Sequence, residues 1–163
     1  MTTTPDSVAR PSLRFTVWAA LAFACLTSGL ANAEPEGGRF QVCPASPNCV
    51  STRATDELHR VEPFAFEGPP EAAFDRLREI VKAEPRTRIV TDEAGYVHAV
   101  FITRWLRFRD DVEFQLDADD GVIHVRSASR VGYGDMGVNR ARVESLRAAF
   151  AAEKTASDRE SEP

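Results

Sequence analysis

The stretch DVEFQLDADDGVIHVR, residues 111–126, decides the fold. Apolar residues take every second position in both of its halves: Val112, Phe114 and Leu116, then Ile123 and Val125. A period of two predicts β-strands with one buried face, and the turn residues at 119–121 predict a hairpin. A hairpin loop of either two or four residues keeps these apolar side chains on the same face of the strands. Depending on the loop, the residue opposite Arg126 is Glu113 or Gln115.

The sequence on either side of this hairpin predicts further strands and two helices. Strands are expected at residues 61–67, 88–91 and 96–103, and the hairpin strands at 111–117 and 121–131. Pro69-Pro70 and Pro85 bracket a helix whose apolar stripe is Phe74, Leu77, Ile80 and Val81. A last helix buries Val143, Leu146 and Phe150, with Asn139 as a candidate cap. The order predicts an α+β fold, a two-layer sandwich of a largely antiparallel sheet of about five strands with two helices on one face.

The N-terminus has the pattern of a cleavable export signal. Residues 1–33 contain two arginines, an apolar run over 15–26 and a small-residue triplet that ends at Ala33. The run is shorter than the about 20 apolar residues that span a bilayer. We expect cleavage after Ala33 and a periplasmic or secreted protein. Two alternatives stay open: lipoprotein processing at Cys25, and an uncleaved signal that anchors the protein to a membrane.

The rest of the chain divides into three parts by composition. Residues 34–61 are rich in Pro, Gly, Ser and Thr and predict an irregular arm, residues 62–152 form the α+β core, and the acidic residues 153–163 predict a disordered tail. The arm carries Cys43 and Cys49, which are expected to form a disulfide in an oxidising compartment. The alternative is that the two cysteines form a redox-active or metal-binding pair. A structural zinc site, however, needs a second pair of ligands, and this segment does not supply one.

Three separated motifs resemble the DUF1499 family. They are CPASPNCVS at residues 43–51, DDVEF at 110–114, and RSASRVGY at 126–133, which continues to Arg140. The resemblance covers residues 43–150. It implies a domain of unknown function, and it transfers no catalytic residue and no cofactor to this chain.

The loop after the hairpin offers the first candidate site. Its GYGDMG sequence, residues 132–137, matches the dinucleotide-binding pattern, but that fingerprint needs a parallel βαβ unit, which the remaining sequence does not supply. Glycines beside a helix N-terminus and nearby arginines are still suited to holding an anion. The candidate ligand-binding residues are Asp111, Glu113, Arg126, Arg130, Tyr133, Asp135, Asn139 and Arg140. The alternative is a tight turn in which the arginines pair with Asp110, Asp111, Glu113 and Asp135.

A hydrolase would draw on Ser127 or Ser129, His98 or His124, and Asp110 or Asp111. Strand parity places both serines on the apolar face and His124 on the other face, and a G-x-S-x-G elbow is absent from the sequence. The three histidines, His59, His98 and His124, lack the spacing of a metal site, and no metal is expected.

The net charge of −5 argues against a nucleic-acid-binding protein. We therefore expect an exported, non-enzymatic binding or envelope-associated module that recognises a partner or an anionic small ligand. The hydrolase remains the alternative hypothesis.

Overall fold

The hairpin predicted from the sequence forms the centre of the sheet. It consists of β5 (Arg109–Asp117) and β6 (Val122–Ser129). A four-residue loop joins Asp117 to its cross-strand partner Val122, and this register places Glu113 opposite Arg126. The apolar parity is buried as expected: Val112, Phe114, Ile123 and Val125 are each 0% exposed. Of the two registers that the sequence allowed, the structure therefore has the one that pairs Glu113 with Arg126.

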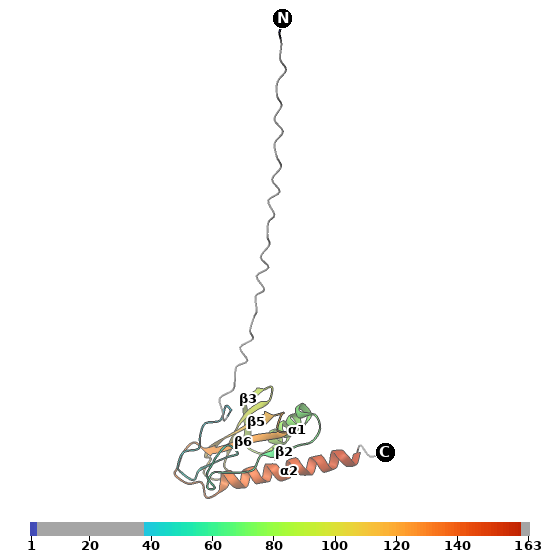
Figure 1. Ribbon diagram of the computed structural model, residues 1–163. Helices are drawn as coiled ribbons and strands as arrows, with labels where there is room; N and C mark the ends of the chain where they lie inside the picture. Colours follow the sequence, from blue (N-terminus) through green and yellow to red (C-terminus); the bar gives the residue numbers. More distant parts are fainter. Residues whose placement is uncertain (3–37, 161–163) are drawn as a thin grey trace. The chain divides into compact units, whose positions relative to one another are not determined.

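The computed structural model describes residues 1–2 and 38–160 (Figure 1). The chain divides into the units Met1–Asn32 and Ala33–Pro163. The predicted export signal, its cleavage after Ala33 and Cys25 lie outside the described residues. The sheet, both helices and the described core residues belong to the second unit, so a chain of residues 33–163 contains the complete fold.

Six antiparallel strands make up the described sheet. β4 (Tyr96–Ile102) pairs with β5, and β3 (Thr87–Glu93) pairs with β4. On the other side of the hairpin, β6 pairs with two short strands, β1 (Cys49–Ser51) and β2 (Phe64–Ala65), giving the order β1-β6-β5-β4-β3 with β2 also on β6. β1 lies inside the predicted irregular arm. Its three residues are all buried and show no alternation that a pattern search can detect.

Two helices complete the α+β fold. α1 (Pro70–Ala83) and α2 (Val138–Glu160) bury the apolar stripes that the sequence predicted, in one core cluster with the apolar side chains of the sheet. Figure 1 shows α2 as the long helix near the C-terminus. It continues to Glu160, into the segment whose composition predicted disorder from residue 153, because Ala, Glu and Lys after Phe150 favour helix.

The arm before β2 is fixed to the sheet by a disulfide and by β1. Cys43 and Cys49 form the expected disulfide, with Cα atoms 5.6 Å apart. Cys49 is itself the first residue of β1, so the disulfide connects the arm to the edge of β6. Among the helices of the described part of the chain, none combines the length and the apolar character that crossing a bilayer requires.

Candidate functional site

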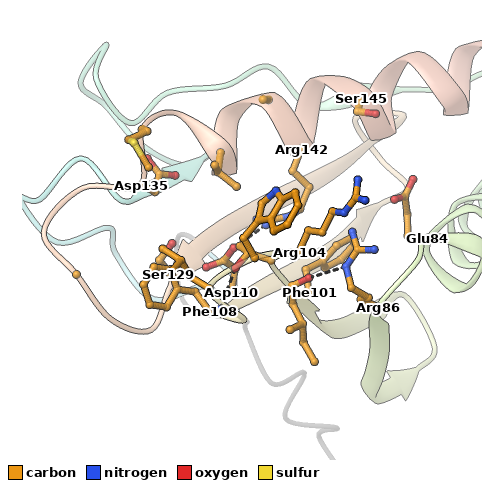
Figure 2. A pocket seen from close by; sticks show the side chains of 18 of the residues that line it. Glu84, Arg86, Phe101, Arg104, Phe108, Asp110, Ser129, Asp135, Arg142 and Ser145 are labelled. Carbon is orange, nitrogen blue, oxygen red and sulfur yellow. Dashed lines mark hydrogen bonds and ion pairs between the residues drawn. The ribbon is translucent and has the colours of Figure 1, made fainter.

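A pocket of about 800 Å³ opens on the helix side of the sheet (Figure 2). It lies where β4 ends, β5 begins and β6 ends, and these strands contribute Phe101, Asp110 and Ser129 to its wall. α2 contributes Arg142 and Ser145 from the other layer. Small-molecule sites have volumes of roughly 300–1,000 Å³, so this pocket has the size of a ligand site.

Two loops form the outer walls of the pocket and make them apolar. The loop from β4 to β5, residues 103–108, and the loop from β6 to α2, residues 130–137, both line it. Their apolar lining residues are Trp105, Leu106, Phe108, Val131 and Met136. All five side chains are also exposed to solvent. The pocket is therefore entered between two apolar loops.

Asp110 is a buried carboxylate on the wall of this apolar pocket. It shares the strand parity of Val112 and Phe114, so it points into the helix layer, and it is 1% exposed. Arg142 Nη2 donates to its Oδ2 over 2.5 Å, which Figure 2 marks with a dashed line. Its Oδ1 is buried and has no hydrogen-bond partner in the described part of the chain. A buried carboxylate oxygen without a donor is energetically costly, so this atom is a hydrogen-bond acceptor that is not yet satisfied.

Arg142 is held from several sides. Its Nη1 donates to Asn139 Oδ1 over 2.8 Å and to Ser127 Oγ over 3.1 Å, and its guanidinium carbon lies 5.0 Å from the centre of the Phe101 ring. With Asp110 on its other nitrogen, the cation is neutralised and fixed in place. It is a structural part of the pocket floor rather than a free anion receptor.

Asn139 connects the helix, the sheet and the arm. It is 0% exposed, and its Nδ2 lies within hydrogen-bond distance of the Asn48 carbonyl at 3.0 Å and of Ser129 Oγ at 2.9 Å. Its Oδ1 accepts from Ser127 Oγ over 2.5 Å. Asn139 was predicted to cap α2, but the cap is Asp135, because its Oδ2 accepts the backbone N–H of Asn139 over 2.8 Å. Asn139 is one residue inside the helix, and its side chain is turned inward.

Four of the predicted ligand-binding residues lie on the opposite, polar face of the sheet, in two pairs. Arg130 makes two hydrogen bonds to Asp111, of 2.8 and 2.7 Å, and these hold the pKa of that carboxyl below its usual range. Arg126 Nη1 donates to Glu113 Oε2 over 3.0 Å. The pairing that the sequence left as the alternative is therefore present, and an anion at these arginines would compete with carboxylates.

Tyr96 and His98 extend these two pairs across β4. The Tyr96 hydroxyl donates to Glu113 Oε1 over 2.7 Å, and His98 Nε2 lies 2.8 Å from Asp111 Oδ1. Burial, with the hydrogen bond to Glu113, raises the pKa of Tyr96. The polar face is a set of interlocked ion pairs and hydrogen bonds.

The other four predicted residues lie at the start of α2. Asp135 caps the helix; its burial favours a higher pKa, but hydrogen bonds from Asn139 and Gly137 outweigh burial and lower it. Tyr133 is 78% exposed on the loop. Arg140 donates to the carbonyls of Leu58 and Arg60 in the arm, over 2.9 and 2.8 Å. The structure therefore separates the eight candidates into two groups, and ligand binding by either group stays a prediction.

The residues considered for a hydrolase do not form a triad: His98 lies beside Asp111, but both candidate serines contact Asn139 on the helix side of the sheet. Ser127 bonds to Asn139 within the core, whereas the Nδ1 of His124 lies 3.1 Å from Thr52 Oγ1 on the other face. The Nε2 atom of His124 lies 3.5 Å from Asp117 Oδ2, which is too long for a full hydrogen bond. Burial, followed by the positive charge of Arg53, lowers the pKa of His124. A serine, a histidine and an acid within mutual reach are not found among these candidates.

Sequence reasoning missed the pocket itself. A signal for Asp110 was present, because its parity with Val112 places a charge on the apolar face of β5. A second signal was the run Arg104-Trp105-Leu106-Arg107, apolar and basic where a connection between strands is usually polar. Neither signal predicts that the two loops face the same cavity, because that depends on the tertiary arrangement.

Comparison with known proteins adds a family and no activity. The DUF1499 family, described as a protein of unknown function, matches residues 39–150. Searches of curated proteins and of solved structures each gave no match. The matched region contains all six described strands, α1 and the part of α2 that packs on the sheet. The chain therefore belongs to the DUF1499 family.

Proposed function

We propose that this domain is a non-enzymatic module that binds a small amphipathic molecule in the pocket between the sheet and α2. The ligand has an apolar body, which contacts the loop walls, and a polar end that donates a hydrogen bond to Asp110. The observation that carries the proposal is the unsatisfied Oδ1 of Asp110 on the wall of an apolar cavity of about 800 Å³.

The chemistry of the floor favours a donor over an anion. The only fully buried acid on the pocket wall is Asp110, and the nearest guanidinium, that of Arg142, already pairs with it. At the floor, a ligand anion would meet the negative oxygen of Asp110 beside a guanidinium that is already paired, because the other lining arginines, Arg86 and Arg104, come from outside the floor. A hydroxyl or an ammonium group would instead supply the missing donor. The anionic ligand that the sequence predicts would instead meet Arg126 and Arg130 on the polar face of the sheet.

The export signal predicted at residues 1–33 supports a place for this binding outside the cytoplasm. With cleavage after Ala33, the domain would meet ligands of the periplasm, the envelope or the surroundings, as a free protein. Lipidation at Cys25 or an uncleaved signal would keep the same pocket beside a membrane. In each case the pocket residues belong to the unit that starts at Ala33.

Competition binding tests the proposal directly. An apolar fluorescent dye such as Nile red is bound to residues 33–163 and displaced by an alkyl alcohol, an alkylamine and an alkyl carboxylate of equal chain length. The alcohol and the amine are expected to bind roughly tenfold more tightly than the carboxylate, which corresponds to about 1.4 kcal/mol. Asp110→Asn should reduce this preference. Equal affinities, or tightest binding of the carboxylate, would contradict the donor assignment.

Two alanines on α2 provide a matched pair of variants for the location. Ala141 lines the pocket and Ala148 does not, and both are exposed. Ala141→Trp should fill the cavity and abolish dye binding, whereas Ala148→Trp should leave it unchanged. Loss of binding in both variants, or in neither, would place the dye elsewhere on the molecule.

A further inference from the structure

The loop from β4 to β5 has an unusual surface composition. Residues 103–109 read TRWLRFR, with three arginines, three large apolar residues and no acid. Trp105 is 83% exposed, Leu106 67% and Phe108 45%. Trp105 and Leu106 contribute little to the stability of the fold, because most of their side-chain surface stays in water.

The facing loop extends this apolar surface across the mouth of the pocket. Val131 and Met136 line the pocket from that side and are 57% and 95% exposed, and Tyr133 in the same loop is exposed as well. Together the exposed side chains of residues 103–108 and 131–136 form an apolar rim. Contiguous exposed apolar groups of this kind mark interaction or membrane sites.

The charges around the rim are positive. Arg104, Arg107 and Arg109 have exposed side chains and pair with no carboxylate within the described residues, and the neighbouring Arg86 bonds to the carbonyl of Ile102. Several other arginines are held by partners: Arg130 pairs with Asp111, and Arg140 donates to backbone carbonyls of the arm. A chain of net charge −5 therefore concentrates uncompensated positive charge at the end that carries its exposed aromatic residues.

The arginines around the rim outnumber the acids. Asp135, at the start of α2, and Glu84, directly after α1 (Figure 2), also line the pocket, and within the described residues neither forms an ion pair with Arg104, Arg107 or Arg109. The segment 103–109, which is the loop and the first residue of β5, contains no acid. The positive charges and the apolar side chains are thus presented together.

We propose that this rim docks onto the surface of an anionic lipid bilayer. Trp105 and Leu106 enter the head-group region, where tryptophan and tyrosine are favoured. Arg104 and Arg107 lie against lipid phosphates, which attract clustered basic residues near a membrane surface. An anionic bilayer offers apolar groups to the apolar side chains of the rim and phosphates to its arginines. Another copy of this acidic chain would complement only the positive charge. Docking would place the pocket mouth at the membrane, and does not depend on any ligand in the pocket.

Vesicle flotation with residues 33–163 tests this proposal. Vesicles of phosphatidylcholine with phosphatidylglycerol should carry the protein upward, and vesicles of phosphatidylcholine alone should carry much less. Binding should weaken as salt is raised, because salt screens the arginines. The full leader is left out, since its apolar run would bind lipid independently of the rim.

Trp105 also reports its own position. The sequence holds two tryptophans, Trp18 and Trp105, so Trp105 is the single one in residues 33–163. Its emission should shift to the blue on anionic vesicles and be quenched by brominated lipids. Unshifted emission in a chain that floats would mean that another surface binds, and would overturn the proposal.

Matched variants separate rim docking from general charge. Trp105→Ala with Leu106→Ala, and separately Arg104→Gln with Arg107→Gln, should each reduce vesicle binding at least tenfold. Arg60→Gln with Arg88→Gln removes the same charge from exposed positions outside the rim and should change binding little. Equal loss in this control would overturn the proposal in favour of non-specific charge. Self-association in sedimentation that Trp105→Ala abolishes, without vesicle binding, would instead assign the rim to a second copy.

Discussion

Asn139 joins three segments that are far apart in the sequence. Its side chain contacts Asn48 in the arm and Ser127 and Ser129 in β6, and Arg142 carries the network on to Asp110. Asn48, the two serines and Asp110 lie in the three motifs that the sequence shares with the DUF1499 family. The motifs therefore build the framework of the pocket, a role that a search for catalytic residues does not identify.

Replacing this amide should cost much of the stability of the domain. Asn139→Ala removes partners from Ser127, Ser129, Arg142 and the Asn48 carbonyl, and buried groups left without partners cost about 1–3 kcal/mol each. We expect the free energy of unfolding to fall by about 3 kcal/mol, measured by urea denaturation. Ser145→Ala, at an exposed position of the same helix outside this hydrogen-bond network, is the control and should change it by less than about 0.5 kcal/mol. A small effect of both would show that the network is dispensable.

The Asp110–Arg142 pair should behave as a buried ion pair. Asp110→Ala leaves the Arg142 guanidinium without its carboxylate, and breaking such a pair costs about 3–5 kcal/mol. Because the pair itself is costly to desolvate, the double variant Asp110→Leu with Arg142→Leu should recover a large part of this loss. Both are measured by urea unfolding. A double variant as unstable as the summed effects of Asp110→Leu and Arg142→Leu, each made alone, would contradict this account.

Protonation of His124 should destabilise the fold as the pH falls. Burial and Arg53 lower its pKa, against the opposing effect of Asp117 and Asp120, so the unfolded chain binds this proton more readily than the folded chain. The stability contribution is fully present above about pH 6.5, the unfolded value, and is lost as the pH falls through the lowered pKa. His124→Gln should flatten this part of the curve of unfolding free energy against pH. Parallel curves for the two proteins would show that another group is responsible.

Individual elements differ in how far their sequences determine them. The structure confirms the hairpin of β5 and β6 and the apolar faces of both helices. Each was predictable because a period of 2 or of 3.6 residues in the apolar positions can be read from a short stretch of sequence. β1 has three residues and no period, and it exists because the edge of β6 and the disulfide hold it in place. The pocket depends on two loops meeting across the layers, so it could not be predicted from either loop alone.

The disulfide should stabilise the fold by restricting this arm. Cys43 and Cys49 close a short loop, for which loss of chain entropy predicts about 2 kcal/mol. Cys43→Ala with Cys49→Ala should lower the free energy of unfolding by that amount. Reduction of the native protein should produce the same change, which serves as the control because it leaves the sequence intact. An unchanged stability in both experiments would mean that β1 holds the arm without the disulfide.

At the scale of the whole molecule, the distribution of charge and apolar surface gives the domain two distinct sides. The polar sheet face is closed by ion pairs between Asp111, Glu113 and their arginines, whereas the end of the sheet carries an open apolar pocket. The composition alone indicated an acidic protein and therefore could not reveal the basic rim. That rim becomes visible only when the loops are placed in space.

The proposed export by the leader predicts a defined covalent form of the whole protein. The protein is produced in a bacterium with its full leader and purified without reductant. The purified chain should lack residues 1–33, and its mass should be lower by two further hydrogens because Cys43 and Cys49 are oxidised to a disulfide. Intact-mass measurement tests both at once, and reduction of the sample should restore the two hydrogens. A diacylglycerol adduct on Cys25 would instead identify a lipoprotein, and an intact leader would identify an anchored form.

β1 and β2 together cover the outer edge of β6. If the arm detached, the backbone N–H and C=O groups of that strand would become a template for a strand of another copy. The arm of a neighbouring chain has the matching sequence, so exchange of arms between molecules would be the natural route to aggregation. By tying β1 to its own chain, the disulfide would therefore also favour a monomer when many copies are folding side by side.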